Sequence, residues 1–300
     1  MITHKLNEAA RSLWQRQMRD WPMAATFYQS LKMVQVKELQ IDQLHFTVQF
    51  NPARRASTSA KVDAKSIEAR PCFLCKKHLP PEQECVDAGE FTLLVNPFPI
   101  FPMHFTIPLK QHAKQQILPW YRHFLQFAYT LDEFVLFYNG PACGASAPDH
   151  LHFQAVTDGL MPLLKDFQTL GKENAVCLEK TASATLYKLK DFLRTAYVIE
   201  SVEIESSFSI FETLYHSWQT VADVEPLMNI IARYSDNTWT VFVLPRKVFR
   251  PRQYFADDET RVMISPAAVE MAGILITPVE EDFHKITPEL IRDIYGQISL

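Results

Sequence analysis

The sequence predicts an α+β fold in which antiparallel sheets are covered by helices. Short alternating segments that end in turns indicate hairpin strands, and they stand both before and after an amphipathic segment at residues 112–133. A length of 300 residues suggests about two domain-sized units. With 47% hydrophobic and 21% charged residues, the composition is that of a globular protein whose core needs no disulfide bonds.

The N-terminal elements are predicted to be helical and then extended. Residues 4–33 carry apolar side chains at helical spacing, with a break at Pro22. Residues 34–50 alternate and end in the strand-like segment Leu44–Phe50. The polar residues 51–70 are too many for a simple connection, which favours a functional loop.

Residues 91–138 predict a meander with one covering helix. Strands are expected at Phe91–Val95 and His104–Pro108, on either side of a proline-rich turn. The amphipathic segment 112–133 is expected to be helical throughout, and Phe134–Tyr138 to be the strand that follows it.

A turn-rich loop begins at Asn139. The chain has only 7 glycines, and both Gly140 and Gly144 lie in this loop. Glycine lets backbone N–H groups approach a ligand closely. The loop runs into residues 150–156, which alternate as a strand does.

That alternation places the polar side chains together. His150, His152 and Gln154 share one face of the expected strand, and the apolar residues between them share the other. Two imidazoles and an amide therefore face the region that the loop encloses. From the residues alone, a half-buried strand with two structural histidines stays an alternative.

The second half repeats the pattern weakly. The segment Thr240–Lys247 resembles Phe105–Lys110, and Ile274–Thr277 is expected to be a strand. Thr287-Pro288-Glu289 has the cap, the first-turn proline and the early acid of a helix start. Since no second His-x-His follows, only the first copy of a duplicated fold would keep the chemistry.

Composition also excludes several classes of partner. A net charge of −4 provides no basic field for nucleic acid, and no apolar run approaches the ~20 residues of a membrane span. The N-terminus lacks the apolar region of a secretory signal. Five cysteines, an odd number, favour thiols or metal ligands in a reducing compartment over a disulfide framework. A cytoplasmic protein is expected.

The segment from Asn139 to Gln154 resembles the histidine-triad superfamily, in particular its His-x-His-x-Gln nucleotidyltransferase branch. That branch includes galactose-1-phosphate uridylyltransferase, diadenosine tetraphosphate phosphorylase and GDP-L-galactose phosphorylase. In the hydrolase branch, a third histidine stands where this chain has Gln154. The loop and motif resemble those of the two phosphorylases more closely than those of the uridylyltransferase, whose motif usually reads His-Pro-His-Gly-Gln. The segment Ile264–Gly273 also resembles the phosphorylases.

The resemblance implies two fused histidine-triad-like units with one active centre. The expected units are a catalytic one at residues 1–158 and a degenerate one at residues 159–300. Such a fusion completes the pseudo-dimer within one chain, so that either a monomer or a homodimer is compatible with it.

Cys72-x-x-Cys75 is half of a zinc-type site. In uridylyltransferases and several zinc-bearing triad proteins, such a pair binds one zinc ion together with a histidine after a strand and the first histidine of the motif. By that resemblance the partners here are His112 and His150, with His78 as a competing ligand. Two thiolates and two imidazoles suit a closed, structural Zn²⁺ site. The metal would anchor His150 and thereby place His152.

The resemblance implies that His152 is the nucleophile. It would attack the α-phosphorus of a nucleotide and form a nucleotidyl-histidine intermediate, from which phosphate or a sugar phosphate takes the nucleotide. An ordinary pKa of about 6.5 leaves an imidazole largely unprotonated at pH 7. Gln154, Ser146 and the amides near Gly144 are the expected donors to the phosphate oxygens. Gln154 keeps a donor but cannot ionise, which favours transfer over hydrolysis.

Further residues are candidates for holding the nucleotide. Asn139 resembles the asparagine that opens the family's loop, and Asn96 resembles the acid or amide that binds ribose hydroxyls, although a turn-forming Asn-Pro pair is equally compatible. Arg54 is expected to clamp a phosphate. The less specific candidates, which are equally typical of surface or core, are Arg246, Lys247, Arg250, Phe98 and Phe101.

The predicted function is that of a nucleotidyltransferase of the phosphorylase type, acting on a dinucleoside polyphosphate or a nucleoside-diphosphate sugar. One alternative is a hydrolase of the same superfamily, in which water attacks the intermediate. Another is a non-enzymatic, zinc-stabilised nucleotide-binding protein, although such a protein needs no nucleophile like His152. The sequence does not indicate whether the base is adenine, guanine or uracil.

Overall fold

The structure is a computed structural model that describes residues 6–54, 64–219 and 221–300. Its N-terminal part consists of α1 (Leu6–Asp20), α2 (Pro22–Ser30), η1 (Leu31–Met33), β1 (Gln35–Ile41), β2 (Leu44–Phe50), η2 (Pro52–Arg54), α4 (Ala64–Glu68) and η3 (Lys76–His78). The helices break at Pro22 and the hairpin ends at Phe50, as the sequence predicted. Residues 55–63 of the predicted functional loop lie outside the described residues.

The remaining elements form two consecutive series. The first contains β3 (Cys85–Ala88), β4 (Phe91–Val95), β5 (His104–Pro108), η4 (Leu118–Trp120), α5 (Tyr121–Thr130), β6 (Phe134–Asn139) and β7 (His152–Thr157). The second contains α6 (Pro162–Leu170), η5 (Gly171–Asn174), β8 (Ala175–Lys180), β9 (Ala184–Leu189), β10 (Tyr197–Ser201), α7 (Ile204–Trp218), β11 (Met228–Ser235), β12 (Thr238–Pro245), α8 (Arg252–Phe255), α9 (Ala268–Met271), β13 (Ile274–Thr277), α10 (Glu280–Lys285) and α11 (Pro288–Ile298).

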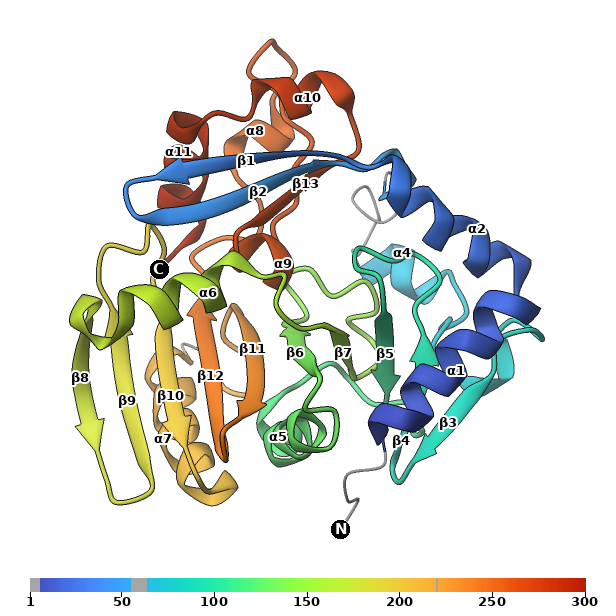
Figure 1. The fold of residues 1–300 in the computed structure, drawn as a ribbon, viewed down its shortest axis with the longest axis horizontal. Helices are drawn as coiled ribbons and strands as arrows, with labels where there is room; N and C mark the ends of the chain where they lie inside the picture. The colour runs from blue at the N-terminus through green and yellow to red at the C-terminus, as the bar shows by residue number, and fades with distance from the viewer. Residues whose placement is uncertain (1–5, 55–63, 220) are drawn as a thin grey trace.

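One large sheet passes through the molecule, and its two halves repeat the same topology (Figure 1). The strand order is β3-β4-β5-β7-β6-β11-β12-β10-β9-β8. Each half has three strands, a helix and two more strands in chain order, and the halves meet where β6 pairs antiparallel with β11. This is the α+β, two-unit architecture that the sequence predicted. The boundary between residues 158 and 159 stays a prediction.

The second half has no loop that corresponds to the glycine-containing loop of the first half. The first half connects β6 to β7 through residues 140–151, whereas the second connects β11 to β12 through Asp236 and Asn237 alone. Both of these residues have positive φ, as a tight hairpin turn requires. The resemblance of Thr240–Lys247 to Phe105–Lys110 would make β12 the counterpart of β5. In the observed repeat, however, the counterpart of β12 is β7. It therefore reflects only a shared strand-then-proline pattern.

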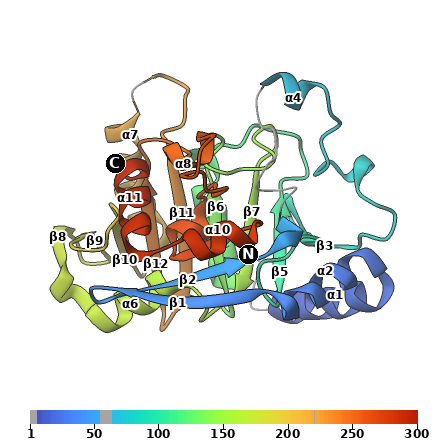
Figure 2. The same ribbon diagram turned by 90° about the horizontal axis from the view of Figure 1, so that it is seen from above.

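A small sheet of order β1-β2-β13 lies across the large one, as Figure 2 shows from above. The pairing of β13 with β2 is parallel, with Ile274 opposite Thr47. This pair departs from the antiparallel sheets that the sequence predicted, because a strand from the C-terminal part joins a hairpin from the N-terminal part. The C-terminal segment is thereby joined to the N-terminal hairpin, and its helix α9 contacts β6 and β11, where the two halves of the large sheet meet.

The two faces of the large sheet bury separate cores. One face packs on α5, α7 and α1, and it holds Leu151, Phe153 and Ala155. The other packs on α6, α9, α11 and the small sheet, and it holds Phe137 and Val156. Because side chains alternate along β7, His152 and Gln154 lie on this second face.

Two predicted elements begin later than expected. The helix predicted at residues 112–133 forms only from Leu118, and β7 begins at His152, not at His150. Backbone hydrogen bonds explain both, since Gln115 N donates to the carbonyl of Pro148 and Leu151 N donates to that of Ala113. Residues 113–115 thus run beside the loop instead of continuing the helix. Within the described ranges, no helix is long and apolar enough to cross a bilayer.

Candidate active site and metal cluster

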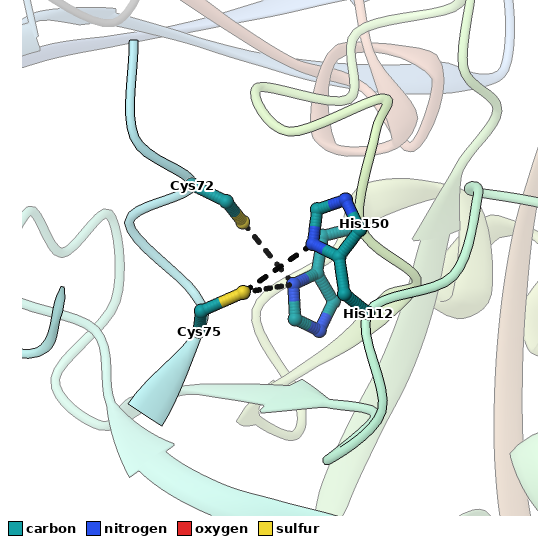
Figure 3. A group of neighbouring side chains, drawn as sticks. All are labelled: Cys72, Cys75, His112 and His150. Carbon is teal, nitrogen blue, oxygen red and sulfur yellow. Dashed lines mark hydrogen bonds between the residues drawn. The ribbon is translucent and has the colours of Figure 1, made fainter. Parts of the chain in front are cut away.

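Four side chains from three separate segments converge on one point (Figure 3). The ligand atoms of Cys72, Cys75, His112 and His150 all lie within 4.8 Å of one another, and the group can hold a metal ion. The sulfur-to-Nδ1 distances are 3.1 Å for Cys72 to His150, 3.3 Å for Cys75 to His112 and 3.7 Å for Cys75 to His150. Ligands on a tetrahedral zinc ion would lie about 3.6 Å apart, given bonds of about 2.3 Å to sulfur and 2.0 Å to nitrogen. The four predicted ligands therefore fit one such ion.

The orientation of His150 is fixed from outside the cluster. Its Nε2 lies 2.7 Å from the carbonyl oxygen of Leu109. A carbonyl only accepts, so Nε2 carries the proton and Nδ1 turns its lone pair to the sulfur atoms. Such a backbone contact is how proteins orient a metal-binding imidazole. His78 lies outside the cluster, because its Nδ1 donates to the carbonyl of Cys72 at 2.8 Å.

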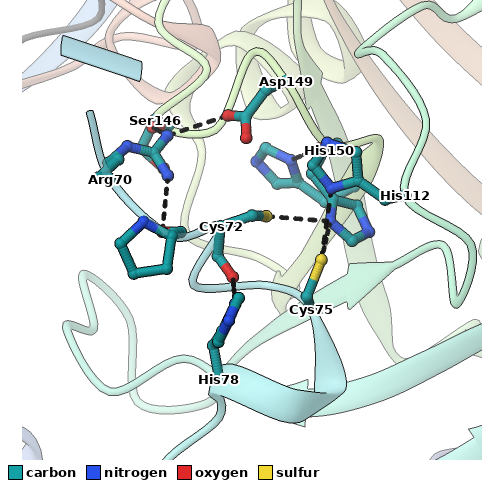
Figure 4. Close-up of polar contacts among 10 residues, drawn as sticks. Arg70, Cys72, Cys75, His78, His112, Ser146, Asp149 and His150 are labelled. Atoms are coloured by element: carbon teal, nitrogen blue, oxygen red, sulfur yellow. Dashed lines mark hydrogen bonds and ion pairs between the residues drawn. The ribbon is translucent and has the colours of Figure 1, made fainter. Parts of the chain in front are cut away.

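The segment that carries the cysteines is tied to the glycine loop (Figure 4). Arg70 donates to Asp149 Oδ1 at 2.9 Å and to the carbonyl of Ser146 at 3.4 Å. Ser146 is exposed on this loop. Its expected phosphate contact stays a prediction.

His152 is buried, with 3% of its surface exposed. Its Nδ1 donates to the carbonyl oxygen of His150 at 2.8 Å, which leaves Nε2 with the lone pair. Burial lowers the pKa of His152 to about 4, although the hydrogen bond to His150 acts in the opposite direction. The imidazole is therefore neutral at neutral pH, with its free lone pair on Nε2.

Gln115 is a positioning residue that sequence reasoning missed. Its Oε1 accepts from His152 N at 2.8 Å, and its Nε2 donates to the carbonyls of His152 at 3.1 Å and Asn139 at 2.9 Å. The amide therefore joins the end of β6 to the start of β7 at the mouth of the loop. No sequence signal pointed to this role, because Gln115 lies within a segment that was expected to be helical.

His104 is a second residue that sequence reasoning passed over. Its Nε2 lies 2.8 Å from Gln154 Oε1, and the ring is 1% exposed. Burial lowers the pKa of His104 to about 3, so that the ring is neutral. The sequence predicted only that His104 begins a strand, and the pairing of that strand with β7 is seen in the structure alone.

Asn96 and Arg54 lie beside that pair. Asn96 Oδ1 accepts from Phe98 N at 2.9 Å, which is the turn-forming role, while its Nδ2 donates to Thr106 at 3.2 Å. Arg54 Nη1 donates to the carbonyl of Phe98 at 3.0 Å, and the Arg54 charge acts on both His104 and Glu270. The ribose and phosphate contacts of these two residues stay predictions.

The aromatic candidates separate into one exposed and one buried. Phe98 is 40% exposed and packs edge-on against Phe27, with ring centroids 4.9 Å apart. Phe101 is 2% exposed and belongs to the core. Of the two, only Phe98 has a surface that a base can reach.

The C-terminal segment supports the glycine loop. Asn139 Oδ1 accepts from Asn229 Nδ2 at 3.0 Å and from Ala268 N at 2.8 Å. Gly144 has φ +101°, and a Cβ there would lie 2.5 Å from Ala267 Cβ. Asn139 and Gly144 are thus fixed by α9 and its flanking residue, and their contact with a phosphate stays a prediction.

We expect Gly144→Ala to destabilise the fold by about 2–4 kcal/mol, through backbone strain and the clash with Ala267. Gly159 is the matched control, because it also has a positive φ but nothing within 4 Å of a built Cβ. Gly159→Ala should lose only the strain contribution, about 1 kcal/mol. Chemical unfolding of both variants measures the difference, and equal losses would refute the close packing of the loop on α9.

Glu225 lies buried under the start of the loop. Tyr138 Oη lies 2.7 Å from its Oε1, and Ile117 N donates to its Oε2 at 2.6 Å. Burial raises the pKa of this carboxyl to about 8, although both hydrogen bonds act in the opposite direction. The folded protein therefore binds a proton here that the unfolded chain releases near its ordinary value of 4.5.

This difference predicts the sign of a pH effect on folding. Between pH 4.5 and 8 the folded state holds more protons at Glu225, so stability falls as pH rises, by at most about 1.4 kcal/mol per pH unit. Glu225→Gln should remove that slope, whereas Tyr138→Phe, which keeps the carboxyl, should retain it. Urea unfolding at a series of pH values measures both variants. A slope that survives in Glu225→Gln would show that other groups cause it.

The basic residues of the second half have different surroundings. Arg246 is buried and donates to Asn229 Oδ1 at 2.6 Å and to the carbonyls of Phe249 at 2.8 Å and Pro266 at 3.1 Å. It holds loops together, so it is neither solvated surface nor a charge placed for a ligand. Lys247 is exposed, and Arg250 donates to Ser265 at 2.9 Å.

Comparisons with known proteins give the fold a context. Residues 172–300 match a family model described as the GDPGP1-like C-terminal domain, and residues 13–157 match one described as a domain of unknown function, DUF4922. No curated protein sequence is similar enough to the chain to count as a match.

Solved structures extend the likeness over the whole chain. Yeast Ap4A phosphorylase Apa2 in complex with Ap4A superposes with a TM-score of 0.66 at 16% identity, covering 100% of this chain and 99% of that one. The same enzyme in complex with AMP has a TM-score of 0.63 at 16% identity, covering 100% and 98%. The chain therefore shares the fold of yeast Ap4A phosphorylase Apa2, and its residues 172–300 are similar to the GDPGP1-like C-terminal domain.

Proposed function

We propose that the protein is a nucleotidyltransferase of the phosphorylase type that works through a nucleotidyl-histidine intermediate on His152. The observation that carries the proposal is the hydrogen bond from His152 Nδ1 to the His150 carbonyl, which leaves Nε2 as a neutral nucleophile. The solved structures of similar fold contain Ap4A and AMP, which supports a nucleotide as the substrate. The substrate class is a dinucleoside polyphosphate or a nucleoside-diphosphate sugar.

The reaction divides into two displacements at one phosphorus atom. His152 Nε2 attacks the α-phosphorus, an N–P bond forms, and the electron pair of the breaking P–O bond leaves with the distal group. An oxygen of inorganic phosphate then attacks the same phosphorus, and the N–P bond breaks with its electron pair returning to Nε2. The product is a nucleoside diphosphate. Gln154, Ser146 and the amides near Gly144 are proposed to stabilise the charge on the phosphate oxygens.

The cluster of Cys72, Cys75, His112 and His150 is proposed to bind a structural zinc ion. Two thiolates and two imidazoles fill all four tetrahedral positions, so the metal would stabilise the fold and leave no position for substrate. Holding His150 also holds the carbonyl that orients His152. Thiolate ligands persist in a reducing compartment, for which we propose the cytoplasm. Because β6 and β11 already join the two halves, a monomer suffices, although a homodimer is compatible.

A product assay tests this function. Ap4A, a GDP-hexose and UDP-glucose are each incubated with the protein, with and without inorganic phosphate. Release of ADP, GDP or UDP that requires phosphate, with ping-pong kinetics, is the expected result and identifies the base. Release of a monophosphate without added phosphate would assign the protein to the hydrolases. Nucleotide binding without any turnover would favour a non-enzymatic nucleotide-binding protein.

A further inference from the structure

Two hydrogen bonds connect the backbone amide of Ile100 to Gln154 through the ring of His104. Ile100 N donates to His104 Nδ1 at 3.4 Å, and His104 Nε2 lies 2.8 Å from Gln154 Oε1. The His104 ring is 1% exposed, with ring centroids 6.4 Å from Phe101 and 6.0 Å from Phe137. The ring is therefore enclosed by protein and shielded from solvent.

The first of these bonds fixes where the His104 proton lies. A backbone N–H only donates, so Nδ1 holds a lone pair and the single proton of the neutral ring is on Nε2. Burial keeps the ring neutral, since it lowers the pKa of His104 to about 3, and the nearby Arg54 charge acts in the same direction. Asn96 Nδ2 lies 3.5 Å from His104 Nε2. Because both of these nitrogens are donors, Asn96 Nδ2 donates to Thr106 instead.

The second bond then fixes the orientation of the Gln154 amide. Nε2–H of His104 donates, so it must meet the carbonyl oxygen of the amide, which is the orientation that the structure has. The amide NH₂ is thereby the end that Gln154 turns away from His104. Gln154 shares a strand face with His152, two residues earlier.

We propose that His104 is a positioning residue that keeps the donor end of Gln154 directed at the phosphate undergoing transfer. This inference rests on the proposed function, because it assigns the amide to a substrate oxygen. Among the described hydrogen bonds, the one from His104 alone distinguishes the two ends of the Gln154 amide. The flipped amide presents a carbonyl dipole to an anion, which would repel it.

A double-mutant cycle separates this role from simple packing. The variants are His104→Leu, Gln154→Ala and the pair together, with His104→Gln as the conservative variant that restores a donor. If His104 acts through Gln154, His104→Leu should lower kcat about 10- to 100-fold with little change in KM. It should have almost no further effect in the Gln154→Ala background, and His104→Gln should recover much of the loss. Losses that multiply in the double variant, or a rise in KM alone, would overturn the proposal.

A spectroscopic test stands apart from turnover. Nitrogen-15 NMR of the wild-type holoprotein reports which imidazole nitrogen of His104 is protonated, and we expect Nε2–H from pH 5 to 9. A proton on Nδ1, or a titration in this range, would overturn the positioning role even in an active enzyme. Conversely, an inactive wild-type protein with the Nε2–H tautomer would contradict the proposed reaction while leaving the orientation of Gln154 as described.

Discussion

His152→Ala is expected to abolish nucleotidyl transfer while nucleotide binding survives. Removing the nucleophile of a covalent mechanism lowers kcat by on the order of 10⁴- to 10⁶-fold, because the remaining groups can bind but cannot form the intermediate. The other residues predicted to contact the nucleotide, among them Gln154 and Arg54, stay in place. Steady-state kinetics and calorimetric titration with the nucleoside monophosphate measure the two properties separately.

The control for this variant is His216→Ala. His216 is exposed on α7, where its side chain bonds to Gln219 and its ring contacts Tyr215, so its loss should leave kcat within about twofold. Melting curves for both variants exclude unfolding as the cause. Residual activity of His152→Ala above a few per cent of wild type would contradict a role for His152 as nucleophile.

Loss of the metal cluster is expected to have the second-largest effect. In Cys72→Ser, the protein should lose most of its zinc and melt roughly 6 °C lower, as a loss of about 4 kcal/mol would produce in a chain of this size. Activity should fall about 10- to 100-fold, since the His150 carbonyl that orients His152 is no longer held. Metal analysis, calorimetry and kinetics measure these three changes.

Cys177→Ser is the matched control, because Cys177 is an exposed free cysteine on β8, outside the cluster. It should keep its zinc, its melting temperature and its activity. Removing zinc from the wild type with a chelator should reproduce the Cys72→Ser phenotype, and restoring zinc should reverse it. Full activity in a metal-free protein would show that the cluster does not position His152.

Local patterns carried much of the prediction. The strands at residues 91–95 and 104–108, the hairpin ending at Phe50 and the helix start at Thr287 were predictable because apolar alternation, turns and caps depend on neighbouring residues. The grouping of Cys72, Cys75, His112 and His150 was predictable from Cys72-x-x-Cys75 together with a family resemblance, whereas the bound zinc stays a prediction. The alternation at His150–Gln154 also gave the correct face for His152.

Contacts between distant segments were beyond such reasoning. Gln115 lay in an amphipathic pattern, and only the course of residues 113–115 beside the loop shows that its amide holds the backbone of His152. The parallel pairing of β13 with β2 joins residues more than two hundred positions apart. The need for glycine at position 144 likewise arises from Ala267, which leaves no room for a Cβ there. The tautomers of His104 and His152 each depend on one backbone group.

A nucleophilic role for His152 is tested most directly by the mass of the peptide that contains it, after a brief incubation with substrate in the absence of phosphate. We expect this peptide to gain the mass of one nucleotidyl group, which is a nucleoside monophosphate less water. Fragmentation should locate the addition on His152, and phosphate should remove it as nucleoside diphosphate forms. Phosphate-dependent product formation with no adduct, or with the adduct on another residue, would contradict a nucleotidyl-histidine intermediate at His152.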